Sequence, residues 1–475
     1  MKVLKNYLFN SAFQIFQIFL PLITAPYVSR VLGPTGVGDY AFSNSVVVYF
    51  GILGVLGLTQ YGNRMIAFYM DEFEKRSQLF WDVFIVRAIS VSVALLIYLG
   101  VLMLLPRGQR ILFLIQAVYL FSVVFDISWF FNGIENFKIT VTRSFIIRIL
   151  SVVSVFVFVK SNDDLWLYAL IMVGGTTLGN LTLWPFLKGL IRPPMIKFGR
   201  LLTVLKQSMV YFLPGIASSV YLVLNKVMIG VLDSNVAAGY FQQSDQIVRL
   251  ALSLVTAMNA VLLPRVANEF KNKNFELIEK YIHKSVSLTL FISLPVMFAL
   301  FELGKVFAPV YFGPGFSEVG NLMAIEGTMV VFIGLNSVVG WQYMMPIGMV
   351  TQMSTSVSVG AVVNFVLNVV LIPFFRARGA ALSSVLSELV ILVIMVAYTK
   401  NKLNFANVFN GMWKYVLAAI VMYLTLLVLH AFIPSNVVFL FVGILLGFIV
   451  YMMMLVLFKA SIVFDFLKMI HFFKF

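Results

Sequence analysis

The sequence predicts an all-α polytopic membrane protein. Of its 475 residues, 61% are hydrophobic and only 11% are charged, and the mean hydropathy is +0.99. Apolar runs long enough to cross a bilayer, which takes ~20 residues each, follow one another along the chain. Because a soluble protein of this length could not bury so much apolar surface, we expect membrane hydrocarbon to cover most of it.

About 14 transmembrane helices are predicted, with short connections between nearly all of them. The N-terminus begins with lysines and an apolar run, but Pro21 and Pro26 lie inside that run. It is therefore expected to be a retained membrane helix, not a cleaved signal peptide. The predicted spans cover residues 11–32, 41–60, 83–105, 111–131, 143–160, 165–187, 207–231, 243–264, 285–304, 322–344, 354–374, 379–399, 413–433 and 436–458.

Basic residues predict the orientation of the chain. Most of the 34 Lys and Arg residues lie in the tails and in the connections that share a side with the N-terminus. Cytoplasmic loops carry such an excess, so both termini are expected in the cytoplasm. The net charge of +15 is explained in the same way, and no nucleic-acid partner is expected.

A weak internal repeat predicts two pseudo-symmetric six-helix lobes. VLGPTGVGDY at 31–40 and VLDSNVAAGY at 231–240 share Val, Leu and Tyr, and each connects the first two spans of a six-span block. Two such blocks in the same orientation are related by an axis along the membrane normal. The predicted division is an N-lobe at 1–187, a cytoplasmic basic linker at 188–206, a C-lobe at 207–402, and two C-terminal spans with a cytoplasmic tail at 403–475.

Several enzyme and metal classes lack their signatures. The sequence contains no GxxxxGK[ST] nucleotide-binding loop, no cysteine and only three scattered histidines, so neither an ATP-driven pump nor a metal site is expected. The short external loops disfavour a membrane glycosyltransferase or polymerase. We expect no catalytic residues, no cofactor and no enzymatic activity.

Charged residues inside predicted spans are candidates for function, because each costs ~2.5–3.5 kcal/mol at mid-bilayer on insertion scales. Arg87 and Arg148 lie about one turn from the cytoplasmic side, where snorkelling to headgroups and a cavity role are equally supported. Lys226 lies deeper, which favours a cavity role. Asp245 and Arg249, four residues apart, slightly favour a self-contained ion pair.

Carboxylates and prolines complete the candidate set. Asp126, Glu326 and Glu388 are either proton or sodium sites or counter-ions, and the sequence does not choose between these roles. Proline frees a backbone carbonyl and bends a helix, so prolines in corresponding helices of the two halves are hinge candidates. These candidates are Pro21, Pro26 and Pro214.

These features resemble the Wzx-type oligosaccharide flippases of the multidrug/oligosaccharidyl-lipid/polysaccharide exporter superfamily. The first half carries the resemblance in NYLFNSAFQIFQIFLPLITAPYVSRVLGPTGVGDYAFSNSVVVYF, QYGNR at 60–64 and DISWFFNGIENFK at 126–138. The second half carries it in LNKVMIGVL at 224–232, GYFQQSDQIVRL at 239–250 and LPRVANEF at 263–270. Asn225 departs from the family, in which an aspartate is expected before the lysine; this weakens an ion-coupling role there.

The resemblance implies a flippase that exports undecaprenyl-pyrophosphate-linked sugar repeat units by alternating access. The implied partners are this lipid-linked oligosaccharide, the bilayer of the bacterial cytoplasmic membrane and, as an additional candidate, polysaccharide polymerase machinery. Coupling to a proton or sodium gradient is left open. The cations expected to bind pyrophosphate in a central cavity are Arg30, Arg64, Arg87, Arg148, Lys226, Arg249 and Arg265. Polar and aromatic walls for the sugars are expected from Gln14, Gln17, Asn44, Tyr49, Tyr221, Asn225 and Gln242.

Two alternatives remain. The lipid-linked cargo could be a teichoic-acid precursor, which is also anionic. A cation-coupled multidrug antiporter forms a different class, but its cavity needs carboxylates, whereas the inward candidates here are mainly basic.

Overall fold

The computed structural model describes residues 2–193, 198–256 and 259–463; within these ranges, the side chains of 2–19, 107, 198, 213–222, 260 and 261 are left undescribed. The described residues form helices and contain no β-strand, so the predicted all-α class is confirmed. The chain divides into two compact units, unit 1 at Met1–Gly239 and unit 2 at Tyr240–Phe475. The predicted lobe and linker boundaries stay a prediction.

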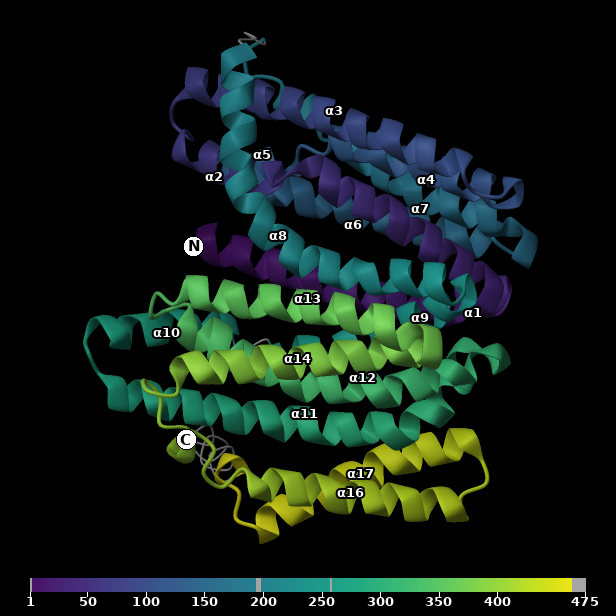
Figure 1. Cartoon of the computed structure of the whole chain (residues 1–475), viewed down its shortest axis with the longest axis vertical. Helices are drawn as coiled ribbons and strands as arrows, with labels where there is room; N and C mark the ends of the chain where they lie inside the picture. The colour runs from purple at the N-terminus through teal and green to yellow at the C-terminus, as the bar shows by residue number, and fades with distance from the viewer. Residues whose placement is uncertain (1, 194–197, 257–258, 464–475) are drawn as a thin grey trace. The chain divides into compact units, whose positions relative to one another are not determined.

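Unit 1 contains eight α-helices of very different lengths among its described residues (Figure 1). Helix α4 packs against α7, α6 packs against α7, and α1 contacts α3, α4 and α8. The helices are α1 (Lys2–Val55), α2 (Leu58–Phe68), α3 (Phe73–Met103), α4 (Arg107–Phe125), α5 (Ser128–Gly133), α6 (Phe137–Phe158), α7 (Leu165–Leu181) and α8 (Phe198–Leu232). Two short 3₁₀ turns, Asn162–Asp164 and Trp184–Leu187, flank α7.

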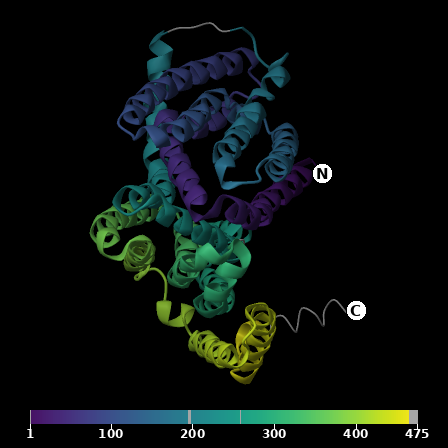
Figure 2. The same cartoon turned by 90° about the vertical axis from the view of Figure 1, so that its right-hand side faces the viewer.

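Helix α9 (Asn235–Thr256) leads into unit 2, where α12 packs against both α11 and α14 and α13 packs against α14. Short α15 leads to a hairpin of α16 and α17 that lies along α11 (Figure 2). The helices are α10 (Asn259–Lys271), α11 (Phe275–Phe312), α12 (Ser317–Asn336), α13 (Val350–Phe375), α14 (Ala377–Thr399), α15 (Phe405–Val408), α16 (Trp413–Phe432) and α17 (Asn436–Leu457). A 3₁₀ turn at Pro314–Phe316 precedes α12, and a π-helical segment at Ser337–Met344 continues it.

Within the described residues, ten helical segments are long and apolar enough to cross a membrane. Leu20–Val55 and Leu58–Phe68 meet at an angle of 44°, and the count is eleven if these two helices form one broken span. The predicted count of 14 therefore stays a prediction. Predicted span 243–264 falls on α9 and α10, and polar residues such as Gln243 and Asp245 interrupt its apolar run. Predicted span 207–231 lies within α8.

The break between the first two predicted spans occurs at a glycine. Helix α1 runs from Lys2 to Val55, and Gly33 is its one residue with non-helical dihedrals, at φ 66° and ψ 178°. Only glycine reaches this region without strain. Helical dihedrals continue through Pro21 and Pro26, as neighbouring helices allow for proline in membrane spans. Pro214 lies within α8, but its side chain is outside the described residues.

Aromatic and aliphatic packing fixes the end of unit 1 that holds the α4–α6 connection. Phe80 of α3 packs its ring against Trp129 and Phe130 of α5, and all three are fully buried. Because aromatic rings remove large apolar areas from water, this cluster holds short α5 in place despite its six residues. The residues at either end of α5 are therefore well positioned.

Candidate functional site

Asp126 stands at the point where α4 ends and the chain turns into α5. Its backbone is extended, at φ −73° and ψ 103°, and its Oδ1 accepts a hydrogen bond of 3.0 Å from the backbone N–H of Ser128. Aspartate side chains favour such turns because they accept from the backbone two residues onward. The other carboxylate oxygen is thus left to face α3.

Arg87 of α3 forms an ion pair with Asp126. Its Nη2 lies 3.4 Å from Oδ2 of Asp126, and its Nη1 lies 3.4 Å from Oγ1 of Thr59. The Arg87 side chain is 3% exposed and that of Asp126 is 26% exposed. A guanidinium buried this deeply needs a compensating charge, which Asp126 supplies.

Arg143 of α6 connects three helices close to this pair. Its Nη1 donates to the backbone carbonyl of Gly179 and lies 3.4 Å from Oδ1 of Asn180, while its Nη2 donates to Oγ of Ser144 at 3.0 Å. The amide of Asn180 donates to the carbonyl and hydroxyl oxygens of Ser122 at 3.0 and 2.9 Å. Helices α4, α6 and α7 are therefore joined by one polar network.

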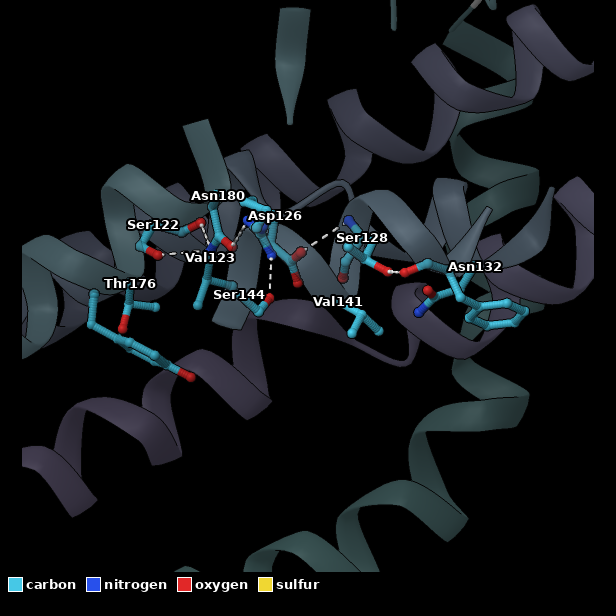
Figure 3. A pocket seen from close by; sticks show the side chains of 13 residues that line it. Ser122, Val123, Asp126, Ser128, Asn132, Val141, Ser144, Thr176 and Asn180 are labelled. Carbon is cyan, nitrogen blue, oxygen red and sulfur yellow. Dashed lines mark hydrogen bonds between the residues drawn. The ribbon is translucent and has the colours of Figure 1, made fainter. Parts of the chain in front are cut away.

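A cavity of about 380 Å³ lies in unit 1 beside this network (Figure 3). It is open to the outside, since Thr176 on its wall is exposed and Asn132 is half-buried. We call it the α4–α7 pocket; its wall consists of Tyr119, Ser122, Val123, Asp126, Ser128, Asn132, Phe137, Thr140, Val141, Arg143, Ser144, Thr176 and Asn180.

The remaining predicted cations of unit 1 lie outside the wall of this pocket. Arg30, Arg64 and Arg148 are exposed, and Nη1 of Arg64 donates to the hydroxyl of Tyr211 at 2.5 Å. Lys226 is half-buried in α8. Of the predicted charged candidates of unit 1, Asp126 lines the α4–α7 pocket and Arg87 is the ion-pair partner of Asp126.

The predicted polar and aromatic residues of unit 1 lie on α8 and α1. Asn225 is buried, at 5% exposure. The side chains of Gln14, Gln17 and Tyr221, expected to form sugar walls, lie outside the described residues. Asn44 and Tyr49 of α1 are half-buried and do not line the α4–α7 pocket.

The predicted charged residues of unit 2 are engaged with neighbours. Nη2 of Arg249 lies 2.7 Å from Oδ1 of Asp245, the i,i+4 pair expected from the sequence. Buried Glu326 accepts from the hydroxyl of Ser244, and Oε2 of Glu388 accepts from the amide of Asn336 at 2.7 Å. Arg265 is exposed, and Gln242 is half-buried.

A second polar network in unit 2 surrounds the π-helical segment. The amide of Asn259 donates to Oγ of Ser337 at 2.6 Å, the amide of Gln342 donates to Oδ1 of Asn259 at 2.8 Å, and the hydroxyl of Ser285 donates to Gln342. π-Helical turns occur frequently at functional sites. Uncharged residues in apolar spans carry little signal in a single sequence, and these were not predicted.

Arg143 and Asn180 are the main residues of the α4–α7 pocket that sequence analysis missed. Arg143 lies at the start of predicted span 143–160, on the side where basic residues are expected in the cytoplasm. The presence of Asn180 inside the apolar run 165–187 is the signal that could have indicated a buried polar contact. No group of three or more His, Cys, Asp or Glu residues that could hold a metal ion occurs in the described part of the chain.

The many long apolar helices of the described residues define a multi-pass membrane protein. The model of the family described as "Polysaccharide biosynthesis protein" matches residues 3–270, more than half of the chain. The chain belongs to this family. The family resemblance stated from the sequence is thereby confirmed.

Curated relatives match over most of their length. A protein of Shigella dysenteriae named "Putative O-antigen transporter" is 22% identical over 392 residues, which cover 80% of this chain and 96% of that protein. A protein of the same name from Escherichia coli (strain K12) is 21% identical over 407 residues, which cover 84% of this chain and 96% of that protein.

Solved transporter structures share the fold. The lipid II flippase MurJ, in an inward-closed conformation, matches with a TM-score of 0.80 and 15% identity over 96% of this chain and all of that chain. An inward-facing MATE-family multidrug transporter of the MOP superfamily matches with a TM-score of 0.64 and 12% identity over 81% of this chain and 94% of that chain. At these identities the likeness establishes the fold.

Proposed function

We propose that this protein is a flippase that moves undecaprenyl-pyrophosphate-linked oligosaccharide repeat units from the cytoplasmic to the outer leaflet of the bacterial cytoplasmic membrane. The observation that carries the proposal is the match to O-antigen transporters over 96% of their length. The family description, polysaccharide biosynthesis, and the fold shared with a lipid II flippase support the same function.

The chemistry of such a cargo requires cations that can bind a pyrophosphate away from water. Guanidinium groups bind phosphate oxygens through two parallel hydrogen bonds, and an ammonium group acts as a point charge. Exposed Arg30, Arg64 and Arg265 and half-buried Lys226 are accessible enough to take this role. Flipping breaks and forms no covalent bond, so the proposed cycle of alternating access needs no catalytic residue and no cofactor.

The antiporter alternative finds less support in the side-chain contacts. Binding of a cationic drug or a coupling ion requires an accessible carboxylate. Asp126 is paired with Arg87, Asp245 with Arg249, and the buried carboxylates of Glu326 and Glu388 accept hydrogen bonds from neighbouring side chains. These contacts favour structural roles for the acidic groups.

The test uses cells from which the gene has been deleted. We expect lipid-linked repeat units to accumulate on the cytoplasmic face and surface polysaccharide to disappear, with both restored by the wild-type gene. Lys226→Ala and Arg64→Ala should reduce restored export several-fold. The matched control is Lys305→Ala, since Lys305 is an exposed cation at a predicted external position.

Each alternative gives a different result. If no lipid-linked sugar accumulates, the flippase proposal fails. Accumulation of a lipid-linked polyol-phosphate polymer would instead identify a teichoic-acid precursor as cargo. Unchanged export in the Lys226 and Arg64 variants, together with loss of drug efflux in Glu388→Gln, would replace the flippase with an antiporter.

A further inference from the structure

The wall of the α4–α7 pocket mixes hydrogen-bond donors and acceptors at close range. Asn132 and Asn180 each offer both kinds of group, Asp126 accepts, Arg143 donates, and Ser and Thr hydroxyls do either. A sugar hydroxyl also donates and accepts, whereas a phosphate oxygen only accepts. A wall of this composition therefore matches a polyhydroxylated ring better than it matches an anion.

The charged side chains of the pocket wall already have partners. Asp126 is paired with Arg87, and the terminal nitrogens of Arg143 are engaged by Gly179, Asn180 and Ser144. A pyrophosphate placed here would meet the carboxylate of Asp126, and the terminal nitrogens of Arg143 would have to leave their present partners to bind it. Like-charge contacts at this range are unfavourable, so the pocket disfavours the anionic end of a lipid-linked sugar.

One polar group of the wall lacks a partner within the described part of the chain. The Nε–H of Arg143 is buried there without an acceptor. Buried polar groups in proteins are nearly always paired, and an unpaired one calls for an explanation such as a ligand. A hydroxyl oxygen of a bound ring would supply the missing acceptor.

The apolar part of the wall and the size of the pocket also fit a sugar. Tyr119 and Phe137 bring aromatic rings to the wall, and the C–H faces of sugar rings pack on such surfaces. The volume of about 380 Å³ lies within the range of roughly 300–1,000 Å³ that is usual for small-molecule sites. The whole undecaprenyl-linked cargo is far larger, so the pocket can hold only a part of it.

We infer that the α4–α7 pocket of unit 1 binds one sugar of the oligosaccharide repeat unit, with Asn132, Thr176 and Arg143 as ligand-binding residues. This inference rests on the proposed flippase function and assigns the carbohydrate part of the cargo to a place separate from the exposed cations proposed for its pyrophosphate. Asp126 is a positioning residue in this site, since it is held by Arg87 and by the N–H of Ser128.

The experiment uses saturation-transfer NMR to measure glycoside binding to the purified full-length protein in nanodiscs. The probes are a panel of methyl glycosides that differ in ring configuration and N-acetylation. We expect at least one glycoside to receive saturation, and its signal to fall at least three-fold in Asn132→Leu and Thr176→Val. Inorganic pyrophosphate, added as a competitor, should leave the glycoside signal unchanged.

Thr177→Val is the matched control. Thr176 and Thr177 are neighbours in α7, and the hydroxyl of each donates to the carbonyl four residues earlier, at 3.0 and 2.8 Å. Only Thr176 lines the pocket, whereas Thr177 is buried elsewhere. The Thr177 variant therefore loses the same local contact and should retain the glycoside signal, which separates ligand binding from helix stability.

The inference is overturned if no glycoside receives saturation, if Asn132→Leu and Thr176→Val leave the signal unchanged, or if Thr177→Val lowers it equally. Displacement of the glycoside by pyrophosphate or by glycerol phosphate would show an anion or lipid-headgroup site instead. Reconstituted wild-type protein that flips the lipid-linked repeat unit without binding any glycoside would overturn this inference alone. Glycoside binding without flipping would count against the proposed function.

Discussion

The carboxylate of Asp39 in α1 accepts a hydrogen bond of 2.8 Å from the side-chain amide of Asn235 at the start of α9. Next to this bond, Gly38 and Gly239 bring their backbones into contact, so that a Cβ built on Gly239 would lie 2.7 Å from Cα of Gly38. These residues belong to the two segments, 31–40 and 231–240, whose sequences resemble each other. The two related turns thus pack directly on one another within unit 1.

Substitution of Gly38 should disturb this contact. A Cβ at position 38 would lie 2.6 Å from the carbonyl carbon of Asn235 and 2.7 Å from Cα of Val236, and backbone atoms cannot rotate away. We expect Gly38→Ala to lower the free energy of unfolding by ~1–3 kcal/mol, as overpacked sites do. Gly100→Ala is the control, because no atom lies within 4 Å of a Cβ there. Unfolding in a denaturing detergent measures the stability of both variants. Equal stability of Gly38→Ala and Gly100→Ala would contradict the prediction.

Removal of Asp126 alone should lower the free energy of unfolding more than removal of Asp126 together with its partner Arg87. Asp126→Ala leaves Arg87, 3% exposed, without a compensating charge, and loss of one partner of a buried pair costs ~3–5 kcal/mol. The double variant Arg87→Leu, Asp126→Ala should regain part of this loss because no buried charge remains. A double-mutant cycle of unfolding free energies checks the prediction, and strictly additive effects would show that the two residues do not interact.

The ion pair between Arg378 of α14 and Glu318 of α12 should contribute little by comparison. Nε and Nη2 of Arg378 lie 2.6 and 2.8 Å from the two carboxylate oxygens of Glu318. The side chains of Arg378 and Glu318 are, however, 51% and 31% exposed. Exposed pairs are worth ~0.2–1 kcal/mol and are screened by salt. We expect Arg378→Gln to change stability within that range at low salt and by less at 1 M NaCl. A loss as large as that of Asp126→Ala would mean that water is excluded from this pair.

The orientation of the chain can be tested because the sequence contains no cysteine, so that one introduced thiol is unique. Lys273 and Gln109 are both exposed and lie at predicted cytoplasmic and external positions. We expect an impermeant maleimide to label Gln109→Cys in intact cells, and to label Lys273→Cys only after the membrane is opened. The reverse pattern would place both termini outside.

The helical architecture could be predicted from the sequence because the bilayer imposes a simple length and polarity rule. Predicted spans 354–374, 379–399 and 436–458 agree closely with α13, α14 and α17. Hydropathy separated the first two spans but could not show how the chain passes from one to the other. The two spans meet within α1 at Gly33, whose non-helical dihedrals are a local backbone property with no effect on average hydrophobicity.

The site was only partly predictable, since charges inside spans are visible in a sequence and their partners are not. Asp126 and Arg87 stood out as ionisable groups in apolar surroundings, but their pairing depends on how α3 and α4 are packed. Arg143 lies at the start of its helix, where a basic residue is ordinary. Its role follows from Gly179 and Asn180 of α7, which three-dimensional packing alone brings to it.

The π-helical segment Ser337–Met344 determines which neighbours the polar side chains of α12 can reach. Asn336 contacts Glu388 of α14, Ser337 contacts Asn259 of α10, and Gln342 contacts Ser285 of α11. A π-helical turn, with its i→i+5 bonds, holds one residue more than an α-helical turn, so deletion of one residue inside the segment would let it close as ordinary α-helix. Gln342 would then lose the wide turns that direct it to Ser285, while Asn336, which precedes the segment, kept its partner. The wide turns thus accommodate one extra residue of chain, and the contacts of Ser337 and Gln342 depend on it.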